Sequence, residues 1–292
     1  MQTPRFAEIL VHGSDAGSFL HSQLTSDVKS LATGACQFAG YCGADGRLQA
    51  LLLLARTGDD EFRLLLPQAL AQPVLERLQR YRLRARCTLA LADAEIAADA
   101  GDSTRAADAR TWQHAAFCWR VRTLPASTTA PPLPIDLWDE QVALGIPWLL
   151  PATSERFLPQ MLALDRLNAF SLRKGCYPGQ EVIARTHYLG RSKRRLARVR
   201  AGAATQSLVG SELVPGDSEA ASGTLIASDS AGAGLAVLLE SATKGAPLHT
   251  PDGANIATFV IESDVSETIG DISLNGSCTP HPAHSVSLSK VV

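Results

Sequence analysis

The segment RKGCYPGQE, residues 173–181, places a cysteine on a turn whose backbone is restricted by two glycines and a proline. Gly175 and Gly179 permit backbone conformations that other residues avoid, and Pro178 fixes one φ angle between them. We therefore expect the loop to have its shape before any ligand binds. Such a loop presents the thiol of Cys176 at a fixed place.

Polar groups stand on both sides of this thiol. Arg173 and Lys174 precede Cys176, and if they also approach it in space they would favour the thiolate, the form that reacts and binds metals. Gln180 and Glu181 offer an amide and a carboxylate that can hydrogen-bond the edge of a polar heterocycle. These residues alone leave a structural interpretation open, in which the cysteine is buried and inert within a tight turn.

The composition is that of a globular protein with a sizeable core. The 292 residues are 46% hydrophobic and 19% charged, with a net charge of −2. This length predicts two or three domains, and this charge argues against direct nucleic-acid binding. No apolar run reaches the ~18–20 residues that span a bilayer, so no membrane contact is expected, and we see no signal peptide. Six cysteines without a C-x-x-C pair indicate reduced thiols and a cytoplasmic location.

Patterns before the motif predict alternating strands and helices, an α+β unit across about 40–122. The expected elements are a strand at 9–11, a helix capped by Ser14 or Asp15, a hairpin at 36–57 with its turn at 43–46, a strand at 61–67 and a helix at 71–83. We place Pro73 in the first turn of that second helix, where proline is tolerated. The alanine-rich 91–111 fits a strand with a loop or a weak helix, and 125–134 is typical of an exposed linker.

After the motif, the run 180–189 predicts a strand or a short helix, and short β-like runs follow to about residue 263. Their regular turns are typical of a small antiparallel barrel or sandwich. Six basic residues in 191–200 indicate a solvated edge strand or a contact with RNA phosphates or a polyglutamyl folate. We expect no metal site. Cys278, His281 and His284 have a possible ligand spacing, but they lie in a tail that we predict to be mostly disordered.

The motif and three further blocks resemble a known family. KGCYPGQE (174–181) is similar to the K-G-C-Y-x-G-Q-E signature of the YgfZ-type folate-binding proteins, which are relatives of the glycine cleavage T-protein, an aminomethyltransferase. The related mitochondrial iron–sulfur maturation factor carries the same motif. GSDAGSFLHSQLTSDV (13–28), YCGADGRLQALLLLAR (41–56) and the run from LGIPW to the motif (144–181) match in the same order. The resemblance covers most of residues 6–195.

This resemblance implies an α+β fold of three domains in a ring, with tetrahydrofolate bound at the centre. A folate-binding domain would consist of residues 1–46 plus 120–192. A ferredoxin-like domain at 47–119 would be inserted into it, and an antiparallel β-barrel at 193–263 would close the ring. Residues 264–292 would form the tail.

The resemblance also implies the site residues. Family members carry an aromatic seven residues before the first block, here Phe6, and a second one before the G-I-P element. Trp138 is the candidate for the second, although Leu137 occupies the strict position. A pterin ring needs such an aromatic wall and a few polar groups, while ordinary core packing is the alternative for both rings. The functional thiol is Cys176, assisted by Lys174, and the candidate folate-binding residues are Phe6, Trp138, Tyr177, Gln180, Glu181 and Arg185.

The aminomethyltransferases use an aspartate near the folate, and residues 88–124 contain no counterpart of its block. Our leading hypothesis is therefore a tetrahydrofolate-binding accessory protein that supports iron–sulfur cluster assembly or repair in client enzymes, including those that thiolate tRNA. Its partners would be folate and iron–sulfur client proteins or assembly factors. A folate-dependent aminomethyltransferase or demethylase is the second hypothesis, and a folate-binding scaffold with a structural Cys176 is the third.

Overall fold

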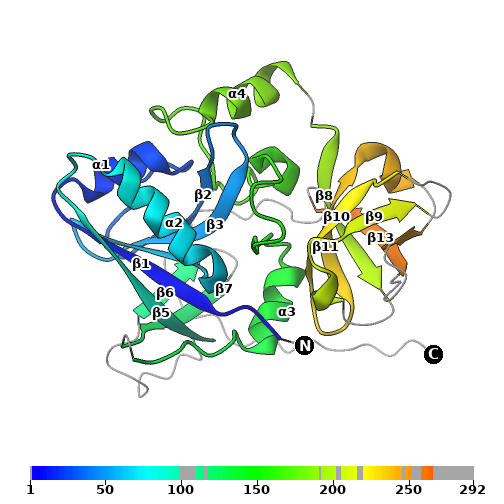
Figure 1. Ribbon diagram of the computed structural model, residues 1–292, viewed down its shortest axis with the longest axis horizontal. Helices are drawn as coiled ribbons and strands as arrows, with labels where there is room; N and C mark the ends of the chain where they lie inside the picture. The colour runs from blue at the N-terminus through cyan, green and yellow to red at the C-terminus, as the bar shows by residue number, and fades with distance from the viewer. Residues whose placement is uncertain are drawn as a thin grey trace.

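The computed structural model describes residues 2–98, 110–114, 117–125, 127–190, 192–201, 205–215, 220–244, 247–250 and 258–265. It contains a curled seven-stranded sheet from the N-terminal half and a closed barrel from the C-terminal part, connected by helices and irregular segments (Figure 1). No described helix is long and apolar enough to cross a membrane. Of the predicted tail at 264–292, residues 266–292 lie outside the described part, and Cys278, His281 and His284 lie there too.

The sheet is antiparallel throughout, in the order β2-β3-β4-β1-β5-β7-β6. Its strands are β1 (Phe6–His12), β2 (Cys36–Cys42), β3 (Leu48–Arg56), β4 (Glu61–Pro67), β5 (Thr88–Ala98), β6 (Arg110–His114) and β7 (Phe117–Thr123). The central β1 pairs along its whole length with β4 and β5. The sheet contains strands from both the predicted folate-binding domain and the predicted inserted domain. The boundaries between these domains remain a prediction.

The predicted hairpin is confirmed. β2 and β3 pair around a turn that runs from Gly43 to Gly46, and Gly46 has a φ of 77°, a conformation that favours glycine. Every residue of β3 except Arg56 is buried, as its continuous apolar run predicts for a strand covered on both faces. The hairpin extends beyond the sheet and carries its turn to the top of the molecule in Figure 1.

Two helices pack on this sheet. α1 (Ala16–Gln23) follows Asp15, which occupies the capping position but directs its carboxylate to Arg86 instead of the helix. α2 (Gln68–Tyr81) crosses one face of the sheet (Figure 1) and buries the apolar side chains Leu70, Ala71, Val74, Leu75 and Leu78. The expected position of Pro73 was wrong. The helix begins at Gln68, three residues earlier than predicted, so Pro73 lies in its second turn.

The described residues of 125–134 are mostly exposed, as predicted, but two of them anchor the segment to the protein. Within 125–134, Ala130 and Leu133 are buried, and the Leu133 amide donates to the carbonyl oxygen of Pro4 (2.9 Å). α3 (Ile135–Ala143), the 3-10 helix η1 (Pro159–Leu162) and α4 (Gln180–Leu189) follow. α3 packs against β10 and β11 of the barrel.

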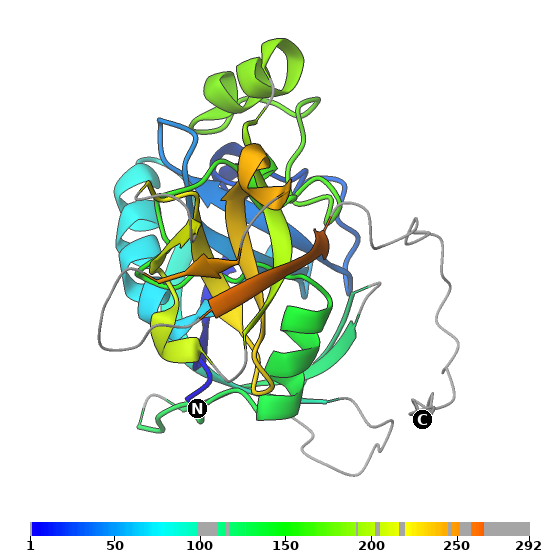
Figure 2. The same cartoon turned by 90° about the vertical axis from the view of Figure 1, so that its right-hand side faces the viewer.

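The C-terminal barrel is confirmed, and its strands close in the order β10-β11-β8-β13-β12-β9. The barrel faces the viewer in Figure 2. Its elements are β8 (Arg194–Ala201), η2 (Gln206–Leu208), β9 (Glu212–Pro215), β10 (Gly223–Ser228), β11 (Ala233–Leu239), η3 (Glu240–Lys244), β12 (Leu248–His249) and β13 (Thr258–Asp264). The basic strand β8 pairs with β11 on one side and β13 on the other, so the prediction of an edge strand was wrong. Ala197, Val199 and Ala201 pack in the barrel core, whereas the exposed positions of the strand are occupied by Arg194, Arg195 and Arg200.

Candidate functional site

The loop that carries Cys176 is docked on the turn of the β2–β3 hairpin. Gly179 has a φ of 79°, and a Cβ added there would lie 2.4 Å from the carbonyl oxygen of Gly43 and 2.6 Å from the amide nitrogen of Gly46. Both contacts are with backbone, which cannot move aside cheaply. The thiol loop and the hairpin turn, which are more than 130 residues apart in the sequence, therefore fit together only if this position is glycine. Cys176 itself is exposed.

The loop is anchored on its inner side and leads into an exposed helix. Tyr177 and Ile183 are buried, and Gln160 Nε2 donates to the carbonyl oxygen of Ile183 (2.8 Å). Ile183 is the buried residue of α4, which stands at the top of the molecule beside the hairpin in both views (Figures 1 and 2). Of the two predictions for 180–189, the short helix is therefore correct. Cys176 lies between a fixed hairpin and a solvent-facing helix.

Lys174 fixes the other end of the loop. Its Nζ donates to the carbonyl oxygens of His21 and Leu24 (2.7 Å to Leu24), at the C-terminal end of α1, and lies 4.8 Å from the centre of the Tyr177 ring. Burial lowers the pKa of Lys174 to about 8, and charges on Asp27 and Cys176 act in the opposite direction. The ammonium is thus engaged by α1 while remaining close enough to the thiol to respond to its charge.

Two further polar residues lie beside the loop. His21 Nδ1 is 3.2 Å from Asp27 Oδ1, and His21 Nε2 would lie 3.9 Å from a Cβ added at Gly175, the residue before Cys176. Burial and the nearby charge of Lys174 lower the pKa of His21, which favours its neutral form. A neutral imidazole can accept a proton. Our sequence reasoning missed both residues, although Asp27 is part of the first family block.

The predicted polar residues of α4 face outward. Arg185 Nη2 lies 3.2 Å from Glu181 Oε1, one helical turn apart, and both side chains are largely exposed. Such solvated pairs contribute little to stability. The backbone amide of Gln180 donates to the carbonyl oxygen of Tyr177 (3.2 Å), which begins the helix. Glu181 and Arg185 are therefore available to a ligand that approaches from solvent.

Phe6 lies in a buried group of rings that we call the aromatic cluster: Phe6, Phe38, His114, Phe117, Trp119 and Trp148. The Phe6 ring meets Trp148 and Trp119 edge-on, with centroid distances of 5.1 and 6.0 Å, and Phe6 is 1% exposed. Trp119 and Trp148 are nearly parallel at 6.3 Å. The strands β1, β2, β6 and β7 and the segment after α3 thus bring together an aromatic wall, of which the sequence indicated only Phe6.

Trp138 is also 1% exposed, and its Nε1 donates to the carbonyl oxygen of Ser228 in β10 (2.9 Å). One turn along α3, Gln141 Oε1 accepts a long hydrogen bond from Trp148 Nε1 (3.3 Å). Trp138 itself is not one of the rings of the aromatic cluster. Its observed contact attaches α3 to the barrel.

Several buried donors near the aromatic cluster lack an acceptor. Among the described residues, Trp119 Nε1, Gln141 Nε2 and Arg166 Nε have no hydrogen-bond partner. Burial lowers the pKa of Arg166 to about 10, and the positive charge of Arg198 acts in the same direction. The charge of Arg166 in turn lowers the pKa of His114. Burial is the main cause that lowers the pKa of His114 to about 4, so its ring is neutral near pH 7.

Unpaired buried donors are costly, and a flat ligand with several acceptor atoms would satisfy them. The donor set and the aromatic wall therefore fit a pterin ring. Phe38 and Cys42 are four residues apart on β2, which corresponds to about 13 Å along a strand. Since Gly43, the residue after Cys42, touches Gly179, β2 connects the aromatic cluster to the thiol loop. Within the described part, no three His, Cys, Asp or Glu side chains are grouped to hold a metal ion.

The chain is similar in sequence to named bacterial proteins and in fold to a solved structure. The chain is 31% identical over 265 residues to the tRNA-modifying protein YgfZ of Edwardsiella ictaluri. The aligned region covers 78% of this chain and 79% of the relative. The chain is 28% identical over 285 residues to the protein of that name from Vibrio vulnificus, covering 88% and 82%. The crystal structure of glycine cleavage system aminomethyltransferase T from Bartonella henselae has a similar fold, with a TM-score of 0.67 and 14% identity over 90% of this chain and 84% of that one. No family model matches the chain.

Proposed function

Since the chain belongs to the YgfZ family, we propose that it is a tetrahydrofolate-binding accessory protein that supports iron–sulfur cluster assembly or repair, with Cys176 as its functional thiol. Relatives are named tRNA-modifying proteins, so the client enzymes would include cytoplasmic ones that thiolate tRNA. The proposal keeps the three-domain arrangement with a ferredoxin-like insertion, which is compatible with the T-protein-like fold.

The observation that carries the proposal is the position of Cys176. The thiol is exposed, yet the loop beneath it is held by backbone contacts at Gly179 and by the buried ammonium of Lys174. A cysteine that served only to fill the turn would be covered by its neighbours. An exposed sulfur on a fixed loop is instead suited to meet a sulfur, iron or thiol group of a partner molecule.

The folate part of the proposal is supported by the aromatic cluster. Trp119 Nε1, Gln141 Nε2 and Arg166 Nε would donate to acceptor atoms of the pterin, and the rings of Phe6 and Trp148 would exclude water. Tetrahydrofolate, when bound, supplies a carrier of one-carbon units. His21, which lies beside Gly175, would accept the proton that the Cys176 thiol releases, and Asp27 Oδ1, 3.2 Å from His21 Nδ1, would stabilise the resulting positive charge.

The second hypothesis, an aminomethyltransferase, shares the fold and the folate. Fold likeness does not carry an activity, because unrelated reactions recur on one fold. The two hypotheses differ in what they require of Cys176, since aminomethyl transfer does not need a thiol. This difference makes the cysteine the best place for a test.

The test is complementation with Cys176→Ser in cells that lack the protein. We expect the variant to fold and to bind tetrahydrofolate, but to leave thiolated nucleosides in tRNA and the activity of iron–sulfur enzymes at the level of the empty vector. Cys36→Ser is the matched control, because Cys36 Sγ lies 2.9 Å from the Gln113 carbonyl oxygen and a hydroxyl can keep this bond. Full rescue by Cys176→Ser would overturn the functional thiol.

A further inference from the structure

A concentration of arginine marks the connection between α2 and β5. The ten residues 77–86, RLQRYRLRAR, contain five arginines and no lysine. We call Arg77, Arg80, Tyr81, Arg82, Arg84 and Arg86 the arginine surface. Nothing in the thiol loop or the aromatic cluster uses these residues, so they need an explanation of their own.

The last turn of α2 arranges the first half of this surface. Arg77, Arg80 and Tyr81 are three and four residues apart and therefore share one helix face. The guanidinium carbon of Arg77 lies 5.8 Å from the centre of the Tyr81 ring, which holds the ring at the surface with 45% of the residue exposed. An exposed tyrosine between arginines offers a flat stacking face surrounded by positive charge.

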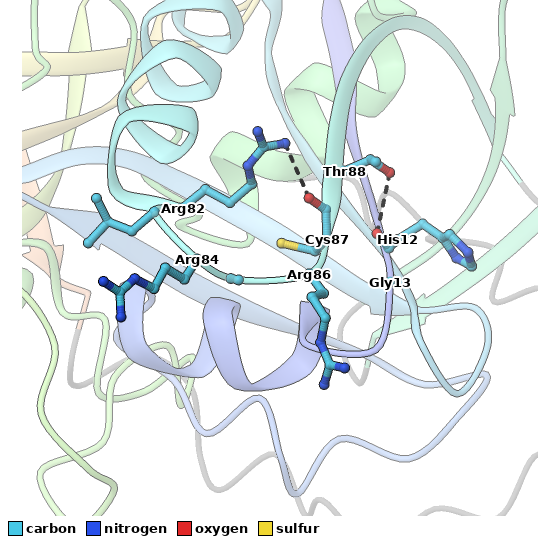
Figure 3. Close-up of a pocket in the computed structure, with 9 residues that line it drawn as sticks. His12, Gly13, Arg82, Arg84, Arg86, Cys87 and Thr88 are labelled. Atoms are coloured by element: carbon cyan, nitrogen blue, oxygen red, sulfur yellow. Dashed lines mark hydrogen bonds between the residues drawn. The ribbon is translucent and has the colours of Figure 1, made fainter.

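The loop after α2 arranges the second half around an open pocket of about 450 Å³. Leu83 adopts a left-handed conformation (φ 45°), which turns the chain sharply and leaves its side chain 85% exposed. Arg82, Arg84 and Arg86 line the pocket together with His12 and Thr88 at its strand side. Figure 3 shows the guanidinium groups of the three arginines spreading from this loop in different directions.

The positive charge of the surface is only partly neutralised. Asp15 holds Arg86 through both carboxylate oxygens, at 3.2 Å each. Arg82 Nη1 donates to the carbonyl oxygen of Cys87 (3.2 Å), which uses a donor but leaves the charge in place (Figure 3). In the part of the chain that the structure describes, Arg80 and Arg84 have no carboxylate partner, and both are exposed.

We propose that the arginine surface binds the phosphate backbone of RNA, with Tyr81 stacking on a base or a ribose. The proposal rests on the proposed function, in which the clients act on tRNA, and it adds that this chain contacts the tRNA directly. Guanidinium groups form paired hydrogen bonds with phosphate oxygens, which explains the use of arginine alone. RNA also presents unstacked bases in its loops, for which an exposed aromatic ring is the usual partner in proteins.

The net charge of −2 does not argue against this surface. Electrostatic attraction of RNA depends on the local potential within about one Debye length, ~8–10 Å in physiological salt. Charges elsewhere on the molecule are screened at larger distances. The composition argued against direct nucleic-acid binding. This expectation therefore has to be tested at the arginine surface.

The surface also lies next to the hairpin that holds the thiol loop. α2, which carries Arg77 and Arg80, contacts β3 of the hairpin. Burial raises the pKa of Tyr41, in β2, to about 12, and the positive charges of the two arginines oppose this shift. Tyr41 precedes Cys42, which neighbours Tyr177 of the thiol loop. An RNA that occupied the arginine surface would thus lie against the same hairpin on which Cys176 is presented.

The experiment measures binding of a fluorescein-labelled, unmodified tRNA transcript to the full chain by fluorescence anisotropy at several salt concentrations. The test variant is Arg80→Glu/Arg84→Glu, at two exposed positions where no hydrogen bond or ion pair of the described structure is lost. Arg5→Glu is the matched control, because Arg5 is exposed and lies next to Phe6, at the opposite end of β1 from His12 and so about 20 Å from the pocket. Arg80→Lys/Arg84→Lys keeps the charge.

We expect the double glutamate variant to raise the Kd for tRNA at least about tenfold and to reduce the slope of log Kd against log salt by about 1–2. Arg5→Glu should change the Kd by less than about twofold, and the lysine variant should recover most of the binding. Tyr81→Ala should weaken binding without changing the salt slope, because stacking carries no charge.

The proposal is overturned if the double glutamate variant binds tRNA like the parent, or if Arg5→Glu weakens binding as much. It is also overturned if polyglutamate displaces tRNA at equal charge concentration, because the surface would then suit an acidic protein. This binding measurement needs neither folate nor Cys176. Loss of rescue by Cys176→Ser together with unchanged tRNA binding by Arg80→Glu/Arg84→Glu would therefore reject this inference while leaving the proposed function intact.

Discussion

Replacement of Gly179 by alanine tests how the thiol loop is held. The new Cβ would lie 2.4 Å from the carbonyl oxygen of Gly43 and 2.5 Å from the Cα of Gly46, both in the hairpin turn. The left-handed conformation costs an alanine about 1–2 kcal/mol, and the forced displacement of packed backbone adds about 1–3 kcal/mol. We therefore expect Gly179→Ala to lower the free energy of unfolding by about 2–5 kcal/mol.

Two other glycines separate these contributions. Gly34 has a φ of 85° and no atom within 4 Å of an added Cβ, so Gly34→Ala carries the conformational cost alone. Gly175 lies in the thiol loop with an ordinary φ, and its nearest neighbour would be His21 Nε2 at 3.9 Å. Gly175→Ala should be neutral or slightly stabilising, by up to about 1 kcal/mol, because alanine restricts the unfolded chain.

The assay is urea unfolding followed by the fluorescence of the four tryptophans, all buried in the folded protein. Midpoints are compared at equal m values, so that a change of stability is not confused with a change of mechanism. We expect Gly179→Ala to unfold first, then Gly34→Ala, and Gly175→Ala last. If Gly179→Ala and Gly34→Ala lose the same free energy, the hairpin does not hold the loop, and the argument for a fixed thiol fails.

Three further predictions concern Lys174, the folate and the reaction. Lys174→Met should cost about 2–4 kcal/mol at pH 7, because two carbonyls of α1 lose their donor. Burial lowers the pKa of Lys174 to about 8, so the folded parent loses this proton at a lower pH than the unfolded chain does. The stability of the parent relative to the methionine variant should therefore rise from pH 8 to 10. A difference in urea midpoints that stays constant over this range would contradict the prediction. Phe6→Leu, which keeps an apolar side chain against Trp148, should weaken tetrahydrofolate binding by about 1–2 kcal/mol in calorimetry, and a protein that shows no heat with any reduced folate would end the pterin assignment. Incubation with tetrahydrofolate and an aminomethylated lipoyl carrier or a methylated glycine should form no methylene-tetrahydrofolate above the control without protein, and clear formation would favour the aminomethyltransferase.

The amino-acid sequence was sufficient for features that depend on neighbouring residues. The glycine turn at 43–46 with its flanking apolar runs predicted the hairpin, because turn geometry and strand pairing are local. The short runs after residue 193 predicted a small antiparallel β domain, and the barrel confirms it. The glycines around Cys176 indicated a constrained loop, and Gly179 is indeed left-handed.

Only the tertiary structure determined which distant residues meet. Gly179 requires a glycine because the hairpin turn touches it, and Lys174 is buried because α1 ends beside it. The strand order places β1, β2, β6 and β7 around one aromatic cluster, and no periodicity along the chain encodes that order. The same reason explains the failure at β8, whose basic side chains are typical of an edge strand, while barrel closure supplies a partner on each side. Local patterns specify the conformation of a segment and the face it buries, but its neighbours are chosen by the packing of the whole chain.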